Sequence, residues 1–153
     1  MNKKIFIVLF FAFAFFVINA DAQEIGVGGS IGTIKRGGSV RGSIVLNIPS
    51  GYHINSSRPR EASLIPTRVS VSSKNARVSA VNYPRGKSRR FTFSDTALSV
   101  YDGRAAISFN ISVPSNFKGN SVKVRVLVSY QSCNDEACFP PRKKEITLTA
   151  KVG

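Results

Sequence analysis

The sequence predicts an all-β fold, an antiparallel sandwich in a single domain. Apolar and polar residues alternate in several runs, as they do in strands with one buried face. Turn residues recur about every ten to fifteen positions, which is typical of an antiparallel sandwich, and no window shows a helical period. The chain of 153 residues has room for one domain with a proper core. The alternation by itself also allows a barrel or a jelly roll.

Residues 1–22 have the composition of a secretory signal peptide. A positive start at residues 3–4 precedes an apolar run over residues 5–18, and an Ala-x-Ala cleavage site ends at Ala22. The alternative is a membrane anchor, for which the apolar run is short. We therefore expect cleavage before Gln23, a mature domain over residues 23–153 and a periplasmic or secreted location, where disulfides persist.

The mature chain begins with a glycine-rich segment. Residues 23–38 contain Ile31 and Ile34 as the only strand-like fragment, so we expect a flexible lead-in or an edge strand there. The alternation over residues 40–48 then predicts a strand with one face buried, and a Pro-Ser-Gly turn at residues 49–51 stops it.

Four more alternating runs follow before the cysteines. We expect strands at Val69 and Val71, at Val78 and Val81 (a ragged run), at Phe91 and Phe93 (a short run), and over residues 107–113 (a long run). Residues 114–120, which include Pro, Asn and Gly, then form the connection to the next strand.

The chain's only two cysteines lie between two further alternating runs. One strand is expected over residues 122–130, ending at Tyr130, and another over residues 146–152, after a basic run. Cys133 and Cys138 therefore fall in a hairpin connection, and the four residues between them allow the two sulfurs to meet.

This cysteine pair has two interpretations. It is either a structural disulfide, as is common in exported proteins, or a redox-active pair. A loop this short stabilises the fold by only about 2 kcal/mol, and short, exposed disulfides exchange readily with other thiols. Asp135 and Glu136 should raise the thiol pKa values, whereas the basic residues 142–144 should lower them, and the sequence leaves this balance open.

Residues 128–141 contain a Tyr-Gln-x-Cys, an acidic spacer, a second cysteine, an aromatic residue and Pro-Pro. This stretch resembles the active-site segment of the amino-terminal periplasmic domain of the thiol:disulfide interchange protein DsbD. Residues 51–59 with 64–67, and residues 98–103, match in the same order, so the resemblance covers most of the chain after residue 40. The spacer has four residues here and five in the best-known member.

The resemblance implies an immunoglobulin-like antiparallel β-sandwich and unequal roles for the cysteines. Cys138 would form the mixed disulfide with a partner, and Cys133 would resolve it. Phe139 and the Pro-Pro after it would fix the second cysteine at the end of the hairpin, because proline restricts the backbone. Tyr130, which opens the motif, would neighbour the site.

The resemblance also implies neighbours from an earlier part of the chain. His53 and Asn55 match two positions beside the cysteines at which the best-known member has tyrosines. His53 is the only histidine, and in that place it could shuttle a proton near neutral pH. The alternative for His53 is a surface side chain after a turn.

A flexible cap loop covers the cysteines in this family, and residues 93–98 match its place. Phe91 or Phe93 is then the candidate lid, and Asp95 is a candidate acid near the sulfurs. The alternative for the two aromatic residues is an ordinary core strand.

The chain is strongly basic. Its formal charge is +14, and removal of residues 1–22 leaves 20 Lys and Arg against 7 Asp and Glu. This charge favours contact with acidic or anionic surfaces. The basic residues are scattered and no nucleic-acid-binding motif accompanies them, so no specific nucleic acid is expected.

Three function classes remain from the sequence. The first is a periplasmic thiol:disulfide oxidoreductase module, a stand-alone copy that works in trans with thioredoxin-like proteins or a membrane electron-transfer protein. The second is an exported binding or adhesion sandwich with a structural disulfide. The third is a metal-handling protein in which the two cysteines and His53 hold copper(I). We expect no cofactor and no metal, because three ligands without a second cysteine pair make a poor metal site. No set of residues typical of a hydrolase active site is visible in the sequence either.

Overall fold

The computed structural model describes residues 24–153, which form eleven strands and no helix. No helix in this part of the chain is therefore long and apolar enough to cross a membrane. The predicted signal peptide lies outside the described residues. The strands are β1 (Gly26–Ile31), β2 (Ser39–Asn47), β3 (His53–Asn55), β4 (Arg68–Ser72), β5 (Arg77–Asn82), β6 (Lys87–Arg89), β7 (Leu98–Tyr101), β8 (Arg104–Ser112), β9 (Ser121–Tyr130), β10 (Ser132–Cys133) and β11 (Arg142–Lys151).

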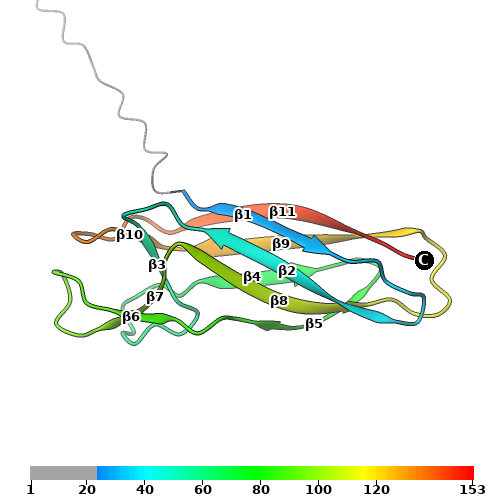
Figure 1. Ribbon diagram of the computed structural model, residues 1–153, viewed down its shortest axis with the longest axis horizontal. Coiled ribbons are helices and arrows are strands. Elements are labelled where there is room, and N and C mark those ends of the chain that lie inside the picture. The colour runs from blue at the N-terminus through cyan, green and yellow to red at the C-terminus, as the bar shows by residue number, and fades with distance from the viewer. Residues whose placement is uncertain (1–23) are drawn as a thin grey trace, which may run out of the picture.

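The strands form three antiparallel sheets. Two of them run along the molecule, with the orders β1-β2-β8-β5 and β11-β9-β4, and the third, β10-β3-β7-β6, lies at one end (Figure 1). The predicted immunoglobulin-like antiparallel sandwich is confirmed. The hairpin connection after β9 and the segment between β6 and β7 project at the same end of the sandwich, opposite the C-terminus (Figure 1).

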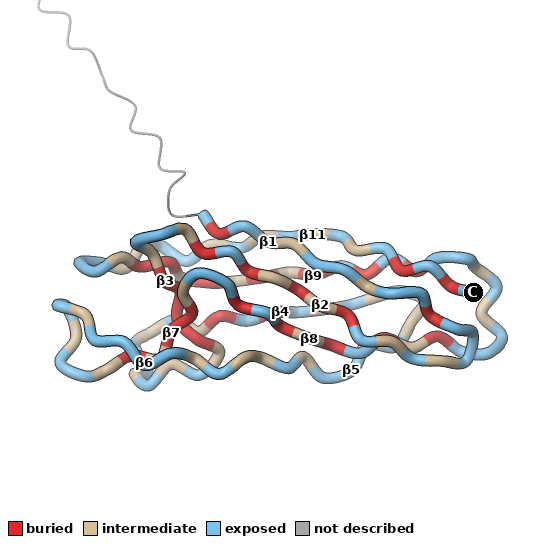
Figure 2. Tube along the Cα trace, viewed as in Figure 1, coloured by how far each residue is buried: buried red, intermediate tan, exposed pale blue. Residues whose placement is uncertain are grey.

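The core lies between the two long sheets. Inward residues alternate with outward ones along the central strands, so buried and exposed positions follow one another along the tube in Figure 2. Each buried Val, Ile or Phe side chain contributes about 1.5–3 kcal/mol through the hydrophobic effect. The buried residues of β2, β8 and β9 in this core are Ile44, Leu46, Ala105, Ile107, Phe109, Ile111, Val122, Val124, Val126, Val128 and Tyr130.

Part of the glycine-rich segment, Gly26–Ile31, forms strand β1. β1 pairs with β2 over its whole length, from Gly26 opposite Asn47 to Ile31 opposite Gly42, so of the two expectations the edge strand is right and the flexible lead-in is wrong. The backbone hydrogen bonds between paired strands need no side chains. This strand therefore forms without the alternating apolar residues by which a strand is recognised in a sequence. The ragged run at β5 has a physical cause as well, because its register with β8 shifts between Ser79 and Asn82.

The short strand expected at Phe91 and Phe93 is wrong. β6 ends at Arg89 and β7 begins at Leu98, and the residues between them form turns and bends. Side-chain hydrogen bonds hold this segment instead of strand pairing. The hydroxyl groups of Ser94 and Thr96 donate to the Glu61 carboxylate at 3.0 and 2.6 Å.

Candidate functional site

The two cysteines form a disulfide in the connection between β9 and β11. The residue pair of these two strands nearest to the connection is Tyr130 opposite Arg142, and both cysteines lie in the connection between these two residues. Cys133 and Cys138 face each other in an antiparallel bridge, with 2.04 Å between the sulfurs and 4.0 Å between the Cα atoms. The predicted position of the pair in a hairpin connection is confirmed.

The four residues between the cysteines form a tight tip. The Asn134 side-chain oxygen accepts hydrogen bonds from the backbone N–H groups of Glu136 (2.9 Å) and Ala137 (2.8 Å), and the Asn134 N–H donates to the Ala137 carbonyl. Asn134 was not among the predicted site residues, although asparagine favours turns of this kind. The acidic side chains of Asp135 and Glu136 are exposed at this tip.

The two cysteines differ in their surroundings. Cys133 is fully buried, because β10 pairs with β3 and brings Cys133 opposite His53. Cys138 is only half-buried. The half-buried Phe139 follows it and lies against Tyr52, with 6.0 Å between the ring centroids. Cys138 is therefore the more exposed residue of the pair, and Cys133 is enclosed.

His53 is a buried neighbour of the disulfide. Its side chain is 3% exposed, so the alternative of a surface histidine is wrong. Burial lowers the pKa of His53 below its usual value, and the negative charges of Asp135 and Asp102 act in the opposite direction. Within residues 24–153 its Nε2 atom has no hydrogen-bond partner. A neutral imidazole can take up a proton at its unprotonated nitrogen, and the imidazolium that forms can release it again.

Phe91 covers His53. The two rings are stacked with 4.0 Å between centroids and 16° between planes, and the exposed Phe93 stacks on Phe91 at 5.4 Å. The Thr92 hydroxyl donates to the Asp135 carbonyl at 2.7 Å, which ties this segment to the cysteine tip. The segment between β6 and β7 thus lies over the histidine, as a lid would, and the alternative of a core strand is wrong. A cavity of about 290 Å³ opens beside it, lined by Gly51, Tyr52, His53, Arg89, Arg90, Phe91, Asp102 and Asp135.

Asn55 and Gln131 join β3 to the hairpin. Asn55 is fully buried, and its amide nitrogen donates to the Ile65 carbonyl (3.0 Å) and to the side-chain oxygen of Gln131 (3.2 Å). The Gln131 amide nitrogen donates in turn to the Phe139 carbonyl at 3.1 Å. Asn55 therefore holds the cysteine segment in place. Gln131 was missed as a site residue, although it belongs to the Tyr-Gln-x-Cys motif.

Within residues 24–153, no side-chain hydrogen bond joins the other two expected neighbours, Tyr130 and Asp95, to the cysteines. Tyr130 is 1% exposed in the hydrophobic core, and its hydroxyl accepts a hydrogen bond from the Ile25 N–H at 3.4 Å. It supports the scaffold because it ends a core strand. Asp95 is exposed, whereas the carboxylates whose charges act on the site are those of Asp135 and Asp102.

Basic residues after the cysteines are partly neutralised. Arg142 and Lys144 lie 3.1 and 3.6 Å from the carboxylate oxygens of Glu24, which partly offset their positive charges. No group of three His, Cys, Asp or Glu residues that could hold a metal ion occurs in residues 24–153.

Comparisons with known proteins identify a family and a similar fold. Residues 31–150 match the family described as "Thiol:disulfide interchange protein DsbD, N-terminal". The fold is similar to that of the N-terminal periplasmic domain of ScsB from Proteus mirabilis, with a TM-score of 0.59, 10% sequence identity and coverage of 86% of this chain. The chain spans 49% of that protein's length. No curated protein matches the sequence.

Two further solved structures are similar at a lower level. One is a family 123 glycoside hydrolase from Clostridium perfringens (TM-score 0.34, 14% identity, 82% of this chain and 27% of that chain). The other is AggA, the major subunit of aggregative adherence fimbriae type I from Escherichia coli (TM-score 0.38, 9% identity, 85% of this chain and 95% of that chain). Similarity at this level carries no argument about function.

Proposed function

Because the chain belongs to the family of the DsbD N-terminal domain, as the match over residues 31–150 shows, we propose that it is a thiol:disulfide exchange module. The observation that carries the proposal is the unequal exposure of the two cysteines in one short hairpin. An inert disulfide needs no such difference, whereas an exchange reaction needs one sulfur that a partner can reach and one that is kept for the second step.

The reaction begins with attack on Cys138. A thiolate of a reduced partner bonds to the Cys138 sulfur while the Cys133–Cys138 bond breaks, and Cys133 leaves as a thiolate that takes up a proton. The partner's second thiolate then attacks the partner sulfur that is bonded to Cys138, which forms the partner's disulfide and releases Cys138 as a thiolate. The partner leaves oxidised, and two electrons have passed to this chain. In the reverse sequence, Cys138 attacks the disulfide of a target protein and Cys133 resolves the mixed disulfide.

The neighbours of the cysteines support this chemistry. Cross-strand partners ordinarily have Cβ atoms about 4.5–5.5 Å apart, and His53 is the cross-strand partner of Cys133. We assign to His53 the proton that Cys133 gains and loses, because its Nε2 is free of other partners within residues 24–153. Phe91 excludes water from this histidine, and the segment that carries Phe91 and Phe93 moves aside when a partner docks.

The proposal includes a compartment and partners. Residues 1–22 are removed as a signal peptide, and residues 23–153 work in the periplasm, where disulfides persist. The electron donors and acceptors are thioredoxin-like proteins or a membrane electron-transfer protein. These partners meet the end of the sandwich at which both the cysteine tip and the Phe91 segment project (Figure 1).

Trapping of mixed disulfides tests the roles of the cysteines. The Cys133→Ser and Cys138→Ser proteins are each incubated with a thioredoxin-like domain whose own resolving cysteine is replaced by serine and whose attacking cysteine is activated as a mixed disulfide. Cys133→Ser, which keeps the accessible Cys138, should form most of the covalent adduct seen on a non-reducing gel. Cys138→Ser should form far less.

Each other outcome has a definite meaning. Equal trace amounts of adduct from both proteins would contradict the proposal and favour an exported binding protein with a structural disulfide. Strong capture by Cys138→Ser alone would show that the two roles are reversed. Thermal melts of both variants show that the difference does not come from unfolding.

A further inference from the structure

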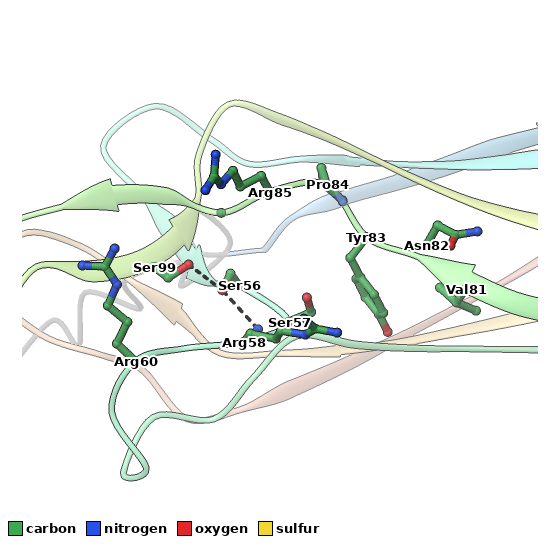
Figure 3. A pocket seen from close by; sticks show the side chains of 11 residues that line it. Ser56, Ser57, Arg58, Arg60, Val81, Asn82, Tyr83, Pro84, Arg85 and Ser99 are labelled. Carbon is green, nitrogen blue, oxygen red and sulfur yellow. Dashed lines mark hydrogen bonds between the residues drawn. The ribbon is translucent and has the colours of Figure 1, made fainter.

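A second cavity lies next to the third sheet. It has a volume of about 530 Å³ and is lined by the segment after β3, the end of β5, the segment between β5 and β6, and one residue of β7. Figure 3 shows Arg58 and Arg60 on the first segment and Arg85 on the second, with Ser56 and Ser99 between them. Neither cysteine lines this cavity, and the exchange reaction does not use it.

The cavity concentrates positive charge without a carboxylate. None of its lining residues is Asp or Glu, and within residues 24–153 none of the three arginines forms an ion pair. Arg60 donates one hydrogen bond, to the Ala97 carbonyl at 3.3 Å. Elsewhere in the same structure arginines find carboxylates, as Arg125 does with Glu145 at 2.6 Å. Three like charges around one cavity repel each other unless an anion lies between them.

The walls of the cavity are held in place by a buried tyrosine. The Tyr101 hydroxyl, on a side chain that is 3% exposed, donates to the Pro84 carbonyl at 3.1 Å and accepts from the Ser57 N–H at 3.2 Å. It thereby joins the segment that carries Arg58 and Arg60 to the segment that carries Arg85. The backbone segments that carry the three arginines are therefore held at fixed positions relative to each other.

The floor of the cavity is equally tight. The hydroxyl oxygens of Ser56 and Ser99 lie 2.9 Å apart, and Ser56 also accepts a hydrogen bond from the Arg58 N–H at 3.2 Å. Gly86 packs directly on this pair, so that a Cβ atom there would lie 2.8 Å from the Ser56 Cβ. Only glycine leaves the space open at this point without a shift of the serines.

We propose that this cavity binds a phosphate group. A phosphate carries close to two negative charges and several acceptor oxygens, which suits several guanidinium groups better than the single charge of a carboxylate. Guanidinium groups bind phosphate oxygens through paired N–H donors, and the Ser99 hydroxyl adds a further donor when it accepts its hydrogen bond from Ser56. The phosphate belongs either to a soluble phosphate compound or to a lipid head group, and the experiment distinguishes these sources.

Inorganic phosphate is the first probe. The ¹⁵N-labelled oxidised protein is titrated with phosphate at pH 7.5 and constant ionic strength, and chemical shifts are followed by NMR. We expect saturable shifts confined to the amides of residues 56–60 and 84–86. Arg58→Gln, Arg60→Gln and Arg85→Gln should each weaken the affinity about tenfold, because each removes a charged hydrogen-bond donor. The matched control is Arg41→Gln, an exposed arginine of β2 outside this cavity, which should bind phosphate as the unchanged protein does.

Vesicles are the second probe. Vesicles that contain phosphatidic acid present phosphomonoester head groups, and vesicles of phosphatidylcholine alone are the reference. Sedimentation with the first kind that depends on the three cavity arginines would assign the phosphate to a lipid. Phosphate binding without such sedimentation would assign it to a soluble compound. The proposal fails if phosphate gives no saturable shifts, or if Arg41→Gln weakens binding as much as the cavity variants do.

Discussion

Reduction of the Cys133–Cys138 disulfide should lower the free energy of unfolding by only about 2 kcal/mol. The bridge joins residues with a sequence separation of 5, and loop-closure entropy for such a short loop amounts to about 2 kcal/mol at 25 °C. The structure supports a small value for a second reason. β9 and β11 pair continuously from Tyr130 opposite Arg142 to Ser121 opposite Lys151, so the ends of the loop are already held without the disulfide.

The same stabilisation energy determines how much folding changes the reduction potential of the disulfide. A stabilisation of about 2 kcal/mol makes the folded disulfide about 30-fold harder to reduce than the same disulfide in the unfolded chain, or roughly 45 mV. This difference is small compared with the spread of potentials among thioredoxin-like proteins, which is on the order of 150 mV. Folding therefore leaves the pair within their reach.

Urea unfolding of the protein with and without reductant measures this effect. The double variant Cys133→Ser/Cys138→Ser is the matched control and should unfold as the reduced protein does. A loss of more than about 4 kcal/mol, or loss of the fold on reduction, would refute the reasoning and identify the disulfide as a structural one.

Three further predictions concern the surroundings of the site and the core. Burial holds the pKa of His53 below its usual value, so the unfolded chain binds more protons than the folded one as the pH falls from about 7 towards 5, and the unfolding free energy should fall with the pH. In His53→Phe, urea unfolding at successive pH values should show an unfolding free energy that depends less on pH. Equal pH dependence in the two proteins would count against this. Phe91→Ala removes the stacked ring, so NMR titration should find the pKa of His53 closer to its usual value, with a loss of stability of about 0.5–1.5 kcal/mol. In Gly42→Ala the new methyl group would lie 2.7 Å from Cε1 of Phe109, so chemical denaturation should show a loss of about 1–3 kcal/mol, while disulfide trapping in the folded protein stays unchanged.

The sequence predicted the long strands and the cysteine hairpin well because both are local patterns. The alternation over residues 107–113 and 122–130 records directly which side chains face the core, and the two cysteines fall between paired strands. β1 was left open between two interpretations because a glycine-rich edge strand is fixed by backbone hydrogen bonds to β2, which leave no pattern in the side chains.

The surroundings of the site depended on contacts that are distant in the sequence. His53 is buried because β10 adds to β3 and Phe91 stacks on its ring, and no local pattern distinguishes it from a surface residue after a turn. Phe91 and Phe93 alternate like a strand, but their segment is shaped by stacking on His53 and by the hydroxyl contacts with Glu61. Only the family resemblance indicated this region, and it did not include the bridging role of Gln131.

The position of the disulfide outside the main ladders allows redox chemistry on a rigid scaffold. Most of the buried core residues lie on β2, β8 and β9, whereas the cysteines lie in a two-residue strand and in the loop that follows it. Contacts that hold this loop, such as Asn55 with Gln131 and Asn134 with Ala137, do not pass through the sulfurs. Breaking the bond between the sulfurs removes one link from a loop that has others, so we expect Cys138 to keep its place at this end of the sandwich after reduction.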